Sequence, residues 1–314
     1  MTRVAAVDCG TNSIRLLVAD LHPGTGELED LDRRMEIVRL GQGVDRTGRL
    51  APEALERTFA ACRTYAEAVR AHGAERLRFV ATSASRDAEN RADFVRGVVD
   101  ILGVEPEVIT GDQEAELSFT GATGELADSS HARPYLVVDI GGGSTEFVVG
   151  DTHARSSRSV DVGCVRLTER HGLTGGPATR EQIDAMRADV EEALDRVAES
   201  VPLEEARTLV GLAGTVTTVA GIALGLDTYD SEAIHHSSVT REQVAAISER
   251  LLAATHEERA AIPVMHPGRV DVIAAGSLVL RTIMERIGAA EVVVSEHDIL
   301  DGIARSCAPE NPRP

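Results

Sequence analysis

An acidic residue, a glycine-containing turn and a hydroxyl group recur in the same order at two places in this sequence. The stretch VDCGTNSIRLLVAD (residues 7–20) aligns without a gap with VDIGGGSTEFVVGD (residues 138–151). Glycine lets the backbone approach a ligand closely, and the amide and hydroxyl groups of such a turn can bind an anion. Asp8 and Asp139 would then lie beside anionic oxygens, where only a divalent cation makes a carboxylate tolerable. A tight hairpin turn is the alternative for one glycine run alone, but the repetition favours two related halves that bind phosphate near a metal ion.

Two further stretches carry groups suited to phosphate chemistry. LVGLAGTVTTVAGI (residues 209–222) predicts a strand, a glycine turn and a helix capped by Thr215, whose N-terminus could face an anion. The same arrangement is also ordinary in α/β folds. ITGDQEAELSF (residues 109–119) places three acidic side chains at a helix start, namely Asp112, Glu114 and Glu116. These acids either interact with the helix dipole or supply a general base toward water, and spacing alone does not choose between the two.

Strands and helices alternate along the chain, which predicts an α/β protein. Apolar, β-branched runs predict strands at residues 4–7, 14–19, 77–81, 136–138, 145–149, 208–212 and 291–294. Amphipathic stretches predict helices at residues 52–72, 88–102, 114–125, 180–200, 241–254 and 270–287. The polar residues 127–134 predict the boundary between the halves, and residues 308–314 predict a frayed tail. A dinucleotide-binding fingerprint is not supported, because Glu146 stands where the third glycine of G-x-G-x-x-G would be.

Composition excludes several classes of protein. The 314 residues carry a formal net charge of -19, which argues against a general nucleic-acid binder, since such proteins need a basic face. All 32 basic residues are arginine, which excludes a P-loop lysine and a Schiff-base lysine. The four cysteines lack the spacing of a disulfide framework or a zinc site. There is no apolar run of ~18 residues and no signal peptide, so we expect a cytoplasmic protein without a membrane span.

Seven motifs together resemble one protein family. They are VDCGTNS, ATSASRDAEN, ITGDQEAELSF, VVDIGGGSTEF, DVGCVRLTE, GLAGTVTT and HPGRVDVIAAGSLVL, in the order and spacing of the exopolyphosphatase and guanosine pentaphosphate phosphatase (Ppx/GppA) family. The resemblance spans essentially the whole chain. It implies an α/β fold of two ribonuclease-H-like domains, as in the actin, sugar kinase and Hsp70 superfold, with an active-site cleft between them. The implied domains are residues 1–126 and 127–297, with a C-terminal helix at about 298–310 packing back onto the first, as in the short, two-domain form of the family.

The resemblance also implies roles for individual residues. Glu114 matches the family's general base, while Gln113 replaces the glutamate before it. Asp139 and Glu146 match acids associated with the divalent metal and the attacking water, which gives Glu146 a catalytic role as well. Asp8 matches the corresponding metal-binding acid of the first hairpin. Phosphate binding is implied for Thr11, Asn12, Ser13, Arg86, Gly141, Gly142, Gly143, Ser144, Thr145, Gly214 and Thr215. Further candidates, either for phosphate contacts or for structural ion pairs, are Arg15, Arg166 and Arg269.

The implied activity is processive, metal-dependent hydrolysis of terminal phosphate from inorganic polyphosphate. Removal of the 5′-phosphate of guanosine pentaphosphate would use the same groups, so the motifs do not separate the two substrates. The motifs leave two more functions open: an actin-fold ATP-dependent kinase, suggested by GLAGT, and a non-catalytic polyphosphate or alarmone sensor. The implied cofactor is Mg²⁺ or Mn²⁺, with a K⁺ requirement left open. The implied assembly is a homodimer without nucleic-acid or membrane partners.

One segment departs from the family pattern. In SEHDILDGI, near the C-terminus, Asp298 stands where glycine is common and Leu300 where arginine is common. The second change removes a basic group, so the family pattern does not define the path of the distal substrate chain here.

Overall fold

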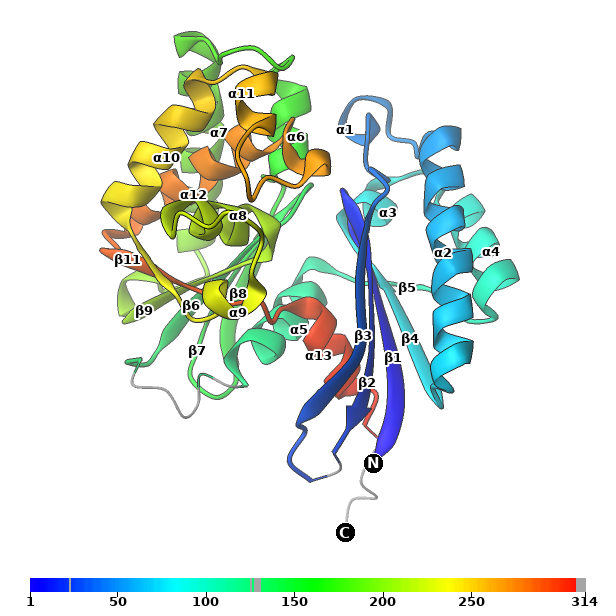
Figure 1. The fold of residues 1–314 in the computed structure, drawn as a ribbon. Coiled ribbons are helices and arrows are strands. Elements are labelled where there is room, and N and C mark those ends of the chain that lie inside the picture. The colour runs from blue at the N-terminus through cyan, green and yellow to red at the C-terminus, as the bar shows by residue number, and fades with distance from the viewer. Residues whose placement is uncertain (23, 125, 127–130, 309–314) are drawn as a thin grey trace. The chain divides into compact units, whose positions relative to one another are not determined.

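The structure is a computed structural model that describes residues 1–22, 24–124, 126 and 131–308. The chain forms two compact units (Figure 1). Unit 1 contains Met1–Gly121 and the C-terminal segment from Ile299, and unit 2 contains Ala122–Asp298. Residues 127–130 of the boundary predicted at 127–134, and residues 309–314 of the predicted tail, lie outside the described residues. None of the described helices has the length and apolar character needed to span a bilayer.

Unit 1 is built on a five-stranded sheet with the strand order β3-β2-β1-β4-β5. The strands are β1 (Thr2–Cys9), β2 (Ser13–Leu21), β3 (Leu28–Ile37), β4 (Arg76–Ala81) and β5 (Glu107–Val108). The first three form an antiparallel meander, whereas β4 pairs parallel with β1 and β5 pairs parallel with β4. The helices are α1 (Val44–Thr47), α2 (Pro52–His72), α3 (Ser83–Asp87), α4 (Arg91–Leu102), α5 (Gly111–Thr123, which ends at the start of unit 2) and α13 (Ile299–Ser306).

The central strand β1 is apolar over most of its length because helices cover both faces of this sheet. Val7 and Cys9 face a core that includes Tyr65 of α2 and Phe94 of α4. Val4 and other residues of the opposite face pack against α13. A strand buried on both sides reads as a continuous apolar run, which is why β1 is easy to recognise in the sequence.

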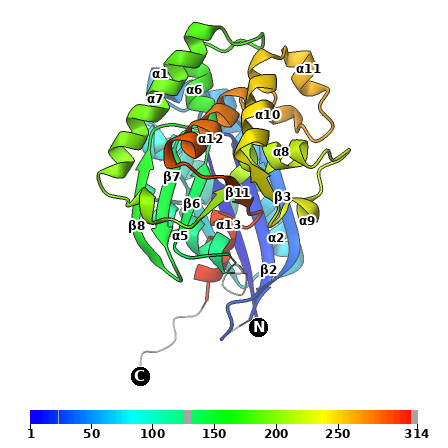
Figure 2. The ribbon, with the colours of Figure 1, turned by 90° about the vertical axis from the view of Figure 1, so that its left-hand side faces the viewer.

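Unit 2 contains a six-stranded sheet with the order β10-β11-β9-β6-β7-β8. The strands are β6 (Tyr135–Ile140), β7 (Thr145–Gly150), β8 (Ala154–Val160), β9 (Thr208–Leu212), β10 (Ser238–Thr240) and β11 (Glu291–Val294). The helices are α6 (Cys164–Arg170), α7 (Arg180–Ala198), α8 (Ala213–Ala223), α9 (Ser231–Ile234), α10 (Arg241–Ala253), α11 (His256–Ala260) and α12 (Ile273–Ile287). Short 3₁₀ turns lie at Leu203–Glu205 and Pro267–Arg269. Helices α7, α8, α10 and α12 cover one face of the sheet and share its apolar core (Figure 2).

The two sheets repeat one topology. Read from β8, the order β8-β7-β6-β9-β11 matches β3-β2-β1-β4-β5, with the same antiparallel and parallel pairings, and β10 is an additional antiparallel edge strand. The turns of the repeated hairpins match as well, since Gly10 N donates to Ser13 O at 2.9 Å and Gly141 N donates to Ser144 O at 3.0 Å. The predicted α/β class, with two ribonuclease-H-like units, is confirmed.

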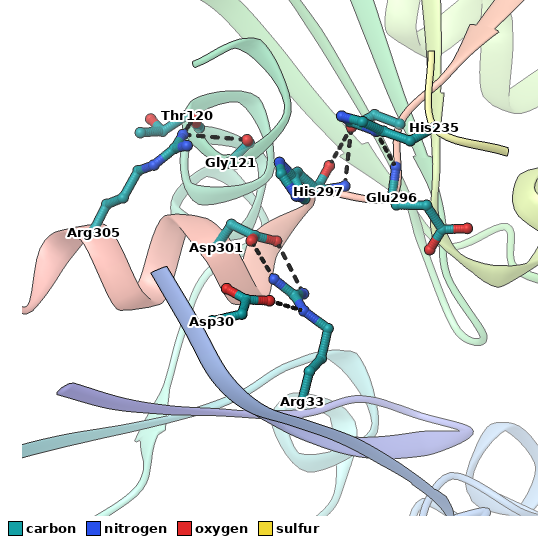
Figure 3. A network of polar contacts seen from close by, with 10 residues as sticks. Asp30, Arg33, Thr120, Gly121, His235, Glu296, His297, Asp301 and Arg305 are labelled. Atoms are coloured by element: carbon teal, nitrogen blue, oxygen red, sulfur yellow. Dashed lines mark hydrogen bonds and ion pairs between the residues drawn. The ribbon is translucent and has the colours of Figure 1, made fainter. Parts of the chain in front are cut away.

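The C-terminal helix α13 packs on the sheet of unit 1 and closely against α5. A Cβ at Gly302 would lie 2.1 Å from the carbonyl oxygen of Leu117, so the two helices meet at backbone distance there. Arg305 of α13 donates to the carbonyl oxygen of Thr120 at 2.9 Å, and the buried Asp301 accepts from Arg33 at 2.6 Å (Figure 3). These contacts fix the position of α5, which carries Glu114.

Leu300 has an internal role in this fold. It is 1% exposed and belongs to the core between α13 and the sheet of unit 1, together with Leu17 and Ile303. The leucine that replaces the family's common arginine therefore serves as a packing residue. Asp298, the other departure from the family pattern, is also buried.

Candidate active site

In unit 1, an arginine on the neighbouring strand holds the first acid of the repeat. Asp8 of β1 pairs in register with Arg15 of β2. Arg15 Nη2 and Nε donate to Asp8 Oδ2 at 2.7 and 3.0 Å, and Asp8 is only 4% exposed. The positive charge of the guanidinium favours the ionised form of this buried carboxylate. The charge of Asp8 is therefore offset from within unit 1.

The turn between β1 and β2 is braced by the loop that follows β3. Asn12 O accepts the backbone N–H of Arg39 at 2.8 Å, and Thr11 O accepts that of Gly41 at 2.8 Å. The Thr11 hydroxyl bonds the Ser83 hydroxyl at 2.8 Å in a buried position. The side-chain hydroxyl of Thr11 is thus engaged within unit 1, although the motif resemblance places it among the phosphate ligands.

Glu114 lies in the first turn of α5, where a capping box fixes the backbone. Thr110 Oγ1 accepts the N–H of Gln113 at 3.3 Å, and Gln113 Oε1 accepts the N–H of Thr110 at 3.0 Å. Glu114 is 8% exposed, whereas Asp112 and Glu116 are exposed. Asp112, in the first turn, therefore fits the helix-dipole interpretation. Of these three acids, Glu114 is the buried one, and its burial fits the general-base interpretation better than the helix-dipole interpretation.

Glu114 is also bonded to an arginine for which the motif resemblance implies a phosphate contact. Arg86 comes from α3, the short helix after β4, and its Nη1 donates to Glu114 Oε2 at 3.1 Å. The same Nη1 atom donates to the carbonyl oxygen of Ile109 at 3.0 Å. The structure thus brings the expected base and an expected phosphate ligand into direct contact within unit 1.

In unit 2, the second hairpin carries two carboxylates opposite each other. Asp139 of β6 pairs in register with Glu146 of β7, so both side chains lie on the same face of the sheet. Asp139 is 7% exposed and Glu146 is 1% exposed, while the Ser159 hydroxyl on β8 donates to Glu146 Oε1 at 2.7 Å. Two buried carboxylates in this arrangement are stabilised in their charged form by a cation.

This carboxylate pair fits the divalent metal that the resemblance implies. Mg²⁺ is usually bound by one or two protein carboxylates and completes its shell with substrate phosphates and water. Within the described part of the chain, no group of three or more His, Cys, Asp or Glu side chains could hold a metal ion. Asp139 and Glu146 are thus two carboxylates that could hold such an ion together with substrate phosphate and water.

The glycine turn between β6 and β7 rests on the start of α6. Gly142 O accepts the N–H of Val165 at 2.9 Å, and Gly143 O accepts Arg166 Nε at 2.7 Å. Gly163 is required at this contact, because a Cβ there would lie 2.4 Å from Gly142 O. Among the described residues the amides of Gly142 and Gly143 donate no hydrogen bond, so the turn keeps two backbone donors for an anion. Arg166 supports the backbone of this turn.

The two hydroxyl residues after the glycines are buried. Thr145 Oγ1 donates to the carbonyl oxygen of Val162 at 2.5 Å, and both Ser144 and Thr145 are almost fully enclosed. The Thr145 hydroxyl therefore holds the hairpin to the segment before α6. We expect this turn to bind an anion mainly through its amides.

The turn between β9 and α8 corrects one prediction. The N-cap of α8 is Leu212, and the helix begins at Ala213, so the assignment of Thr215 as the cap is wrong. Thr215 lies inside the first turn and packs against Gly276, where a Cβ would fall 2.5 Å from Thr215 Oγ1. Ala213 has φ 65°, a left-handed conformation that costs of order 1–3 kcal/mol and is found at functional sites.

Arg269 covers the backbone at the start of α8. A Cβ at Gly214 would lie 1.3 Å from Arg269 Nη1, so a side chain there would displace the guanidinium from its present place. Burial raises the pKa of the nearby Cys164 thiol, although the Arg269 charge opposes this shift. Burial also raises the pKa of Cys9, the neighbour of Asp8. Both cysteines are therefore protonated thiols at neutral pH, which does not favour a thiolate nucleophile at either turn.

Comparisons with known proteins agree with these features. The model of the Ppx/GppA phosphatase family matches residues 17–310. The chain belongs to this family. Exopolyphosphatase 2 of Mycobacterium tuberculosis (strain CDC 1551 / Oshkosh) is 52% identical over 319 residues, which cover 98% of this chain and 99% of that protein.

Solved structures of the Ppx/GppA family support the same assignment. The crystal structure of an exopolyphosphatase-like protein has 42% identity and a TM-score of 0.92, over 96% of this chain and 97% of that one. The crystal structure of the Aquifex aeolicus family member has 30% identity and a TM-score of 0.79, over 97% of each chain. The resemblance inferred from the seven motifs is confirmed.

Sequence reasoning missed several residues that support the site. The Thr110 and Gln113 capping box has a recognisable T-x-x-Q signature, so it could have been found. Ser159, which bonds Glu146, lies in a polar edge strand and carries no signal of its own. The pairing of Asp8 with Arg15 could have been deduced from the hairpin register, because the two residues flank the turn symmetrically.

Proposed function

We propose that this protein is a metal-dependent exopolyphosphatase that removes the terminal phosphate of inorganic polyphosphate. The observation that carries the proposal is the buried carboxylate pair Asp139 and Glu146 beside a glycine turn with two available amides. The 52% identity to a protein named exopolyphosphatase 2 supports the choice of substrate. A chain with a net charge of -19 must neutralise a polyanion locally, and a carboxylate-bound cation with backbone donors meets that need.

Unit 2 supplies the groups that bind phosphate and metal in this proposal. Asp139 and Glu146 would hold Mg²⁺ or Mn²⁺, which when bound neutralises charge on the phosphate oxygens. The amides of Gly142 and Gly143 would bind the terminal phosphoryl group, and Arg166 fixes the turn that carries them. These groups position and neutralise the substrate, which is most of what phosphoryl transfer requires from a protein.

Unit 1 supplies the general base. Glu114 would accept a proton from the water that attacks the terminal phosphorus in line, and the shortened polyphosphate would leave as an anion. No bond between substrate and protein forms in this step, which agrees with the raised pKa values of Cys9 and Cys164. The hydrogen bond from Arg86 and the capping box hold the Glu114 carboxylate in a fixed place.

Phosphate release from long-chain polyphosphate tests this proposal directly. We expect the wild type to release phosphate in the presence of Mg²⁺, and we expect this release to stop when a chelator removes the metal. Glu114→Gln should lower kcat roughly 10²- to 10⁴-fold, the range for a general base, while KM stays within about twofold. Glu116→Gln is the matched control, since Glu116 is exposed on the same helix, and it should keep wild-type activity. Unchanged turnover in Glu114→Gln would refute the assignment of the base.

The same assay distinguishes the rival functions. Phosphate release from guanosine pentaphosphate alone would change the substrate and keep the base. Transfer of phosphate from polyphosphate to ADP, without free phosphate, would indicate a kinase. Tight binding of polyphosphate with no release under any metal condition would indicate a sensor.

A further inference from the structure

We infer that Arg86 is a positioning residue, which acts on the reaction by orienting Glu114 and keeping it ionised. This inference rests on the proposed role of Glu114 as general base. It differs from the role that the motif resemblance implies, a direct contact between Arg86 and phosphate. The geometry favours the positioning role, because Arg86 Nη1 is already shared between Glu114 Oε2 at 3.1 Å and the carbonyl oxygen of Ile109 at 3.0 Å.

Both ends of this ion pair are fixed to rigid backbone. Arg86 lies on α3, whose residues Ser83, Ala84 and Ser85 are buried, and its N–H donates to Thr82 O at 3.0 Å. The Ile109 carbonyl lies at the end of β5, where the Ile109 N–H donates to Ala81 O at 3.1 Å. Arg86 therefore links the ends of β4 and β5 to the start of α5.

The opposite end of the pair is equally constrained. The capping box formed by Thr110 and Gln113 sets the first turn of α5, and Glu114 N donates to Thr110 O at 3.0 Å. Farther along α5, the close contact between Leu117 and Gly302 holds the helix against α13. The Glu114 carboxylate is thus directed by its backbone and by the guanidinium of Arg86.

The physical consequence is a buried carboxylate beside a positive charge. The side chain of Glu114 is 10% exposed, and burial alone disfavours the charged form of a carboxyl group. A neighbouring guanidinium opposes that effect by favouring the charged form, and it restricts the side-chain rotamer. A general base must be both deprotonated and correctly oriented to accept a proton from water. Loss of Arg86 should therefore reduce the rate of the chemical step more than it reduces substrate binding.

A double-mutant cycle tests this inference. We expect Arg86→Gln to lower kcat about tenfold to a hundredfold, with KM within about twofold, because it removes an interaction that serves the transition state. In a Glu114→Gln background, adding Arg86→Gln should cost less than about threefold further, because coupled residues are not additive. The acid limb of the pH–kcat profile should move up by about one pH unit in Arg86→Gln, as the loss of an adjacent positive charge predicts.

Two further variants complete the experiment. Arg86→Lys keeps the positive charge and should restore most of the wild-type acid limb while kcat remains lower, since lysine lacks the guanidinium geometry. Arg96→Gln is the control, because Arg96 is an exposed arginine of unit 1 that pairs with the nearby Asp93 on the same helix, and all parameters should stay unchanged. If Arg86→Gln does not fold, the comparison of Arg86→Lys with the wild type still reports kcat against KM.

The outcomes separate this inference from the proposed function. A several-fold rise in KM for Arg86→Gln, or full additivity in the cycle, would show that Arg86 contacts the substrate directly and would overturn the inference while leaving the proposed function intact. If the wild type released no phosphate from polyphosphate or guanosine pentaphosphate, the proposed function would fail and the inference with it.

Discussion

The two hairpins of the repeat have the same backbone conformation but carry different charged side chains. In both, the strand pairing and the hydrogen bond across the turn are the same. In the first, the acid Asp8 faces Arg15 across the strands, and the two form an ion pair at 2.7 Å. In the second, the corresponding acid Asp139 faces another acid, Glu146. The position that supplies a cation in unit 1 supplies a second anion in unit 2.

This difference teaches that the two copies of one motif have separate chemical roles. The carboxylate of Asp8 is charge-compensated within its own unit, so it has less need of a metal ion. The pair in unit 2 concentrates negative charge in a buried position, which a divalent cation relieves. We therefore expect the metal to depend mainly on the second hairpin, and the first hairpin to contribute mainly to structure and phosphate binding.

The largest expected effect comes from breaking the carboxylate pair of the second hairpin. Glu146→Gln should lower kcat roughly 10²- to 10³-fold, the range for losing one preorganised electrostatic group. It should also raise the Mg²⁺ concentration that gives half-maximal phosphate release, because a neutral amide is a weaker ligand for Mg²⁺ than a carboxylate. Phosphate release over a Mg²⁺ titration measures both quantities.

Ser159→Ala serves as the graded control for this variant. The hydroxyl of Ser159 orients Glu146 without carrying charge, so its loss should cost only about tenfold, as for groups that orient a metal ligand. If the Mg²⁺ dependence of Glu146→Gln equalled that of the wild type, the metal would not depend on this pair.

A smaller effect on activity is expected from the first hairpin. Asp8→Asn should lower the free energy of unfolding by about 2 kcal/mol, because it removes the charged hydrogen-bond partner of Arg15. The Mg²⁺ concentration for half-maximal activity should stay within about twofold of the wild type. Thermal or denaturant unfolding and the same Mg²⁺ titration provide the measurements.

Arg15→Gln tests the same pair from its other side and should show a comparable loss of stability. A shift in Mg²⁺ dependence for Asp8→Asn as large as that for Glu146→Gln would make Asp8 a metal ligand, as the family resemblance implies. The inferred difference in metal binding between the two hairpins would then be wrong.

How far the fold can be predicted depends on where each strand lies in its sheet. All seven predicted strands lie in the interior of their sheets; β11 does so because β10 pairs along its outer side. Their burial explains why their sequences are apolar. The strands that the sequence does not reveal, β3, β5, β8 and β10, are the edges of the two sheets. Edge strands tend to be short or charged, which protects them from pairing with other chains. The sequence of β3, LEDLDRRMEI, therefore lacks the apolar pattern that identifies a strand.

The candidate site can be predicted as a set of residues, but their partners cannot. Glu114, Asp139 and Glu146 are identifiable because their motifs are distinctive. The contact between Arg86 and Glu114 joins residues separated by 28 positions, and it depends on how α3 and α5 pack against the sheet. Likewise, the guanidinium of Arg269 reaches Gly214 from a distant turn, and no local pattern encodes that approach. Long-range contacts of this kind follow from tertiary packing rather than from local propensity.

The smallest expected effect concerns the support beneath the second hairpin. The helix α6, on which the glycine turn rests, is tied to α7 through Asp189, whose Oδ2 lies 3.0 Å from both Arg170 Nη1 and His171 Nε2. Burial raises the pKa of Asp189, but the hydrogen bonds from His171 and Arg170 outweigh it and hold the pKa below its usual value. The stabilisation is therefore complete above the unfolded-state pKa, about 3.9, and is lost as the pH falls through the lower folded-state pKa.

Asp189→Asn tests this support through its pH dependence. At pH 7 the variant should lose about 0.5 kcal/mol, a value reduced for the 29% exposure of the Asp189 side chain, and about 1–2 °C in Tm. The difference from the wild type should shrink below about pH 4, once the carboxyl group is protonated in both states. Asp184→Asn, which removes an exposed acid from the same helix, should change Tm less at either pH. If the difference in Tm were the same at pH 7 and pH 3, Asp189 would support α6 by packing. The charge of its carboxylate would then add nothing to the stability of the helix on which the second hairpin rests.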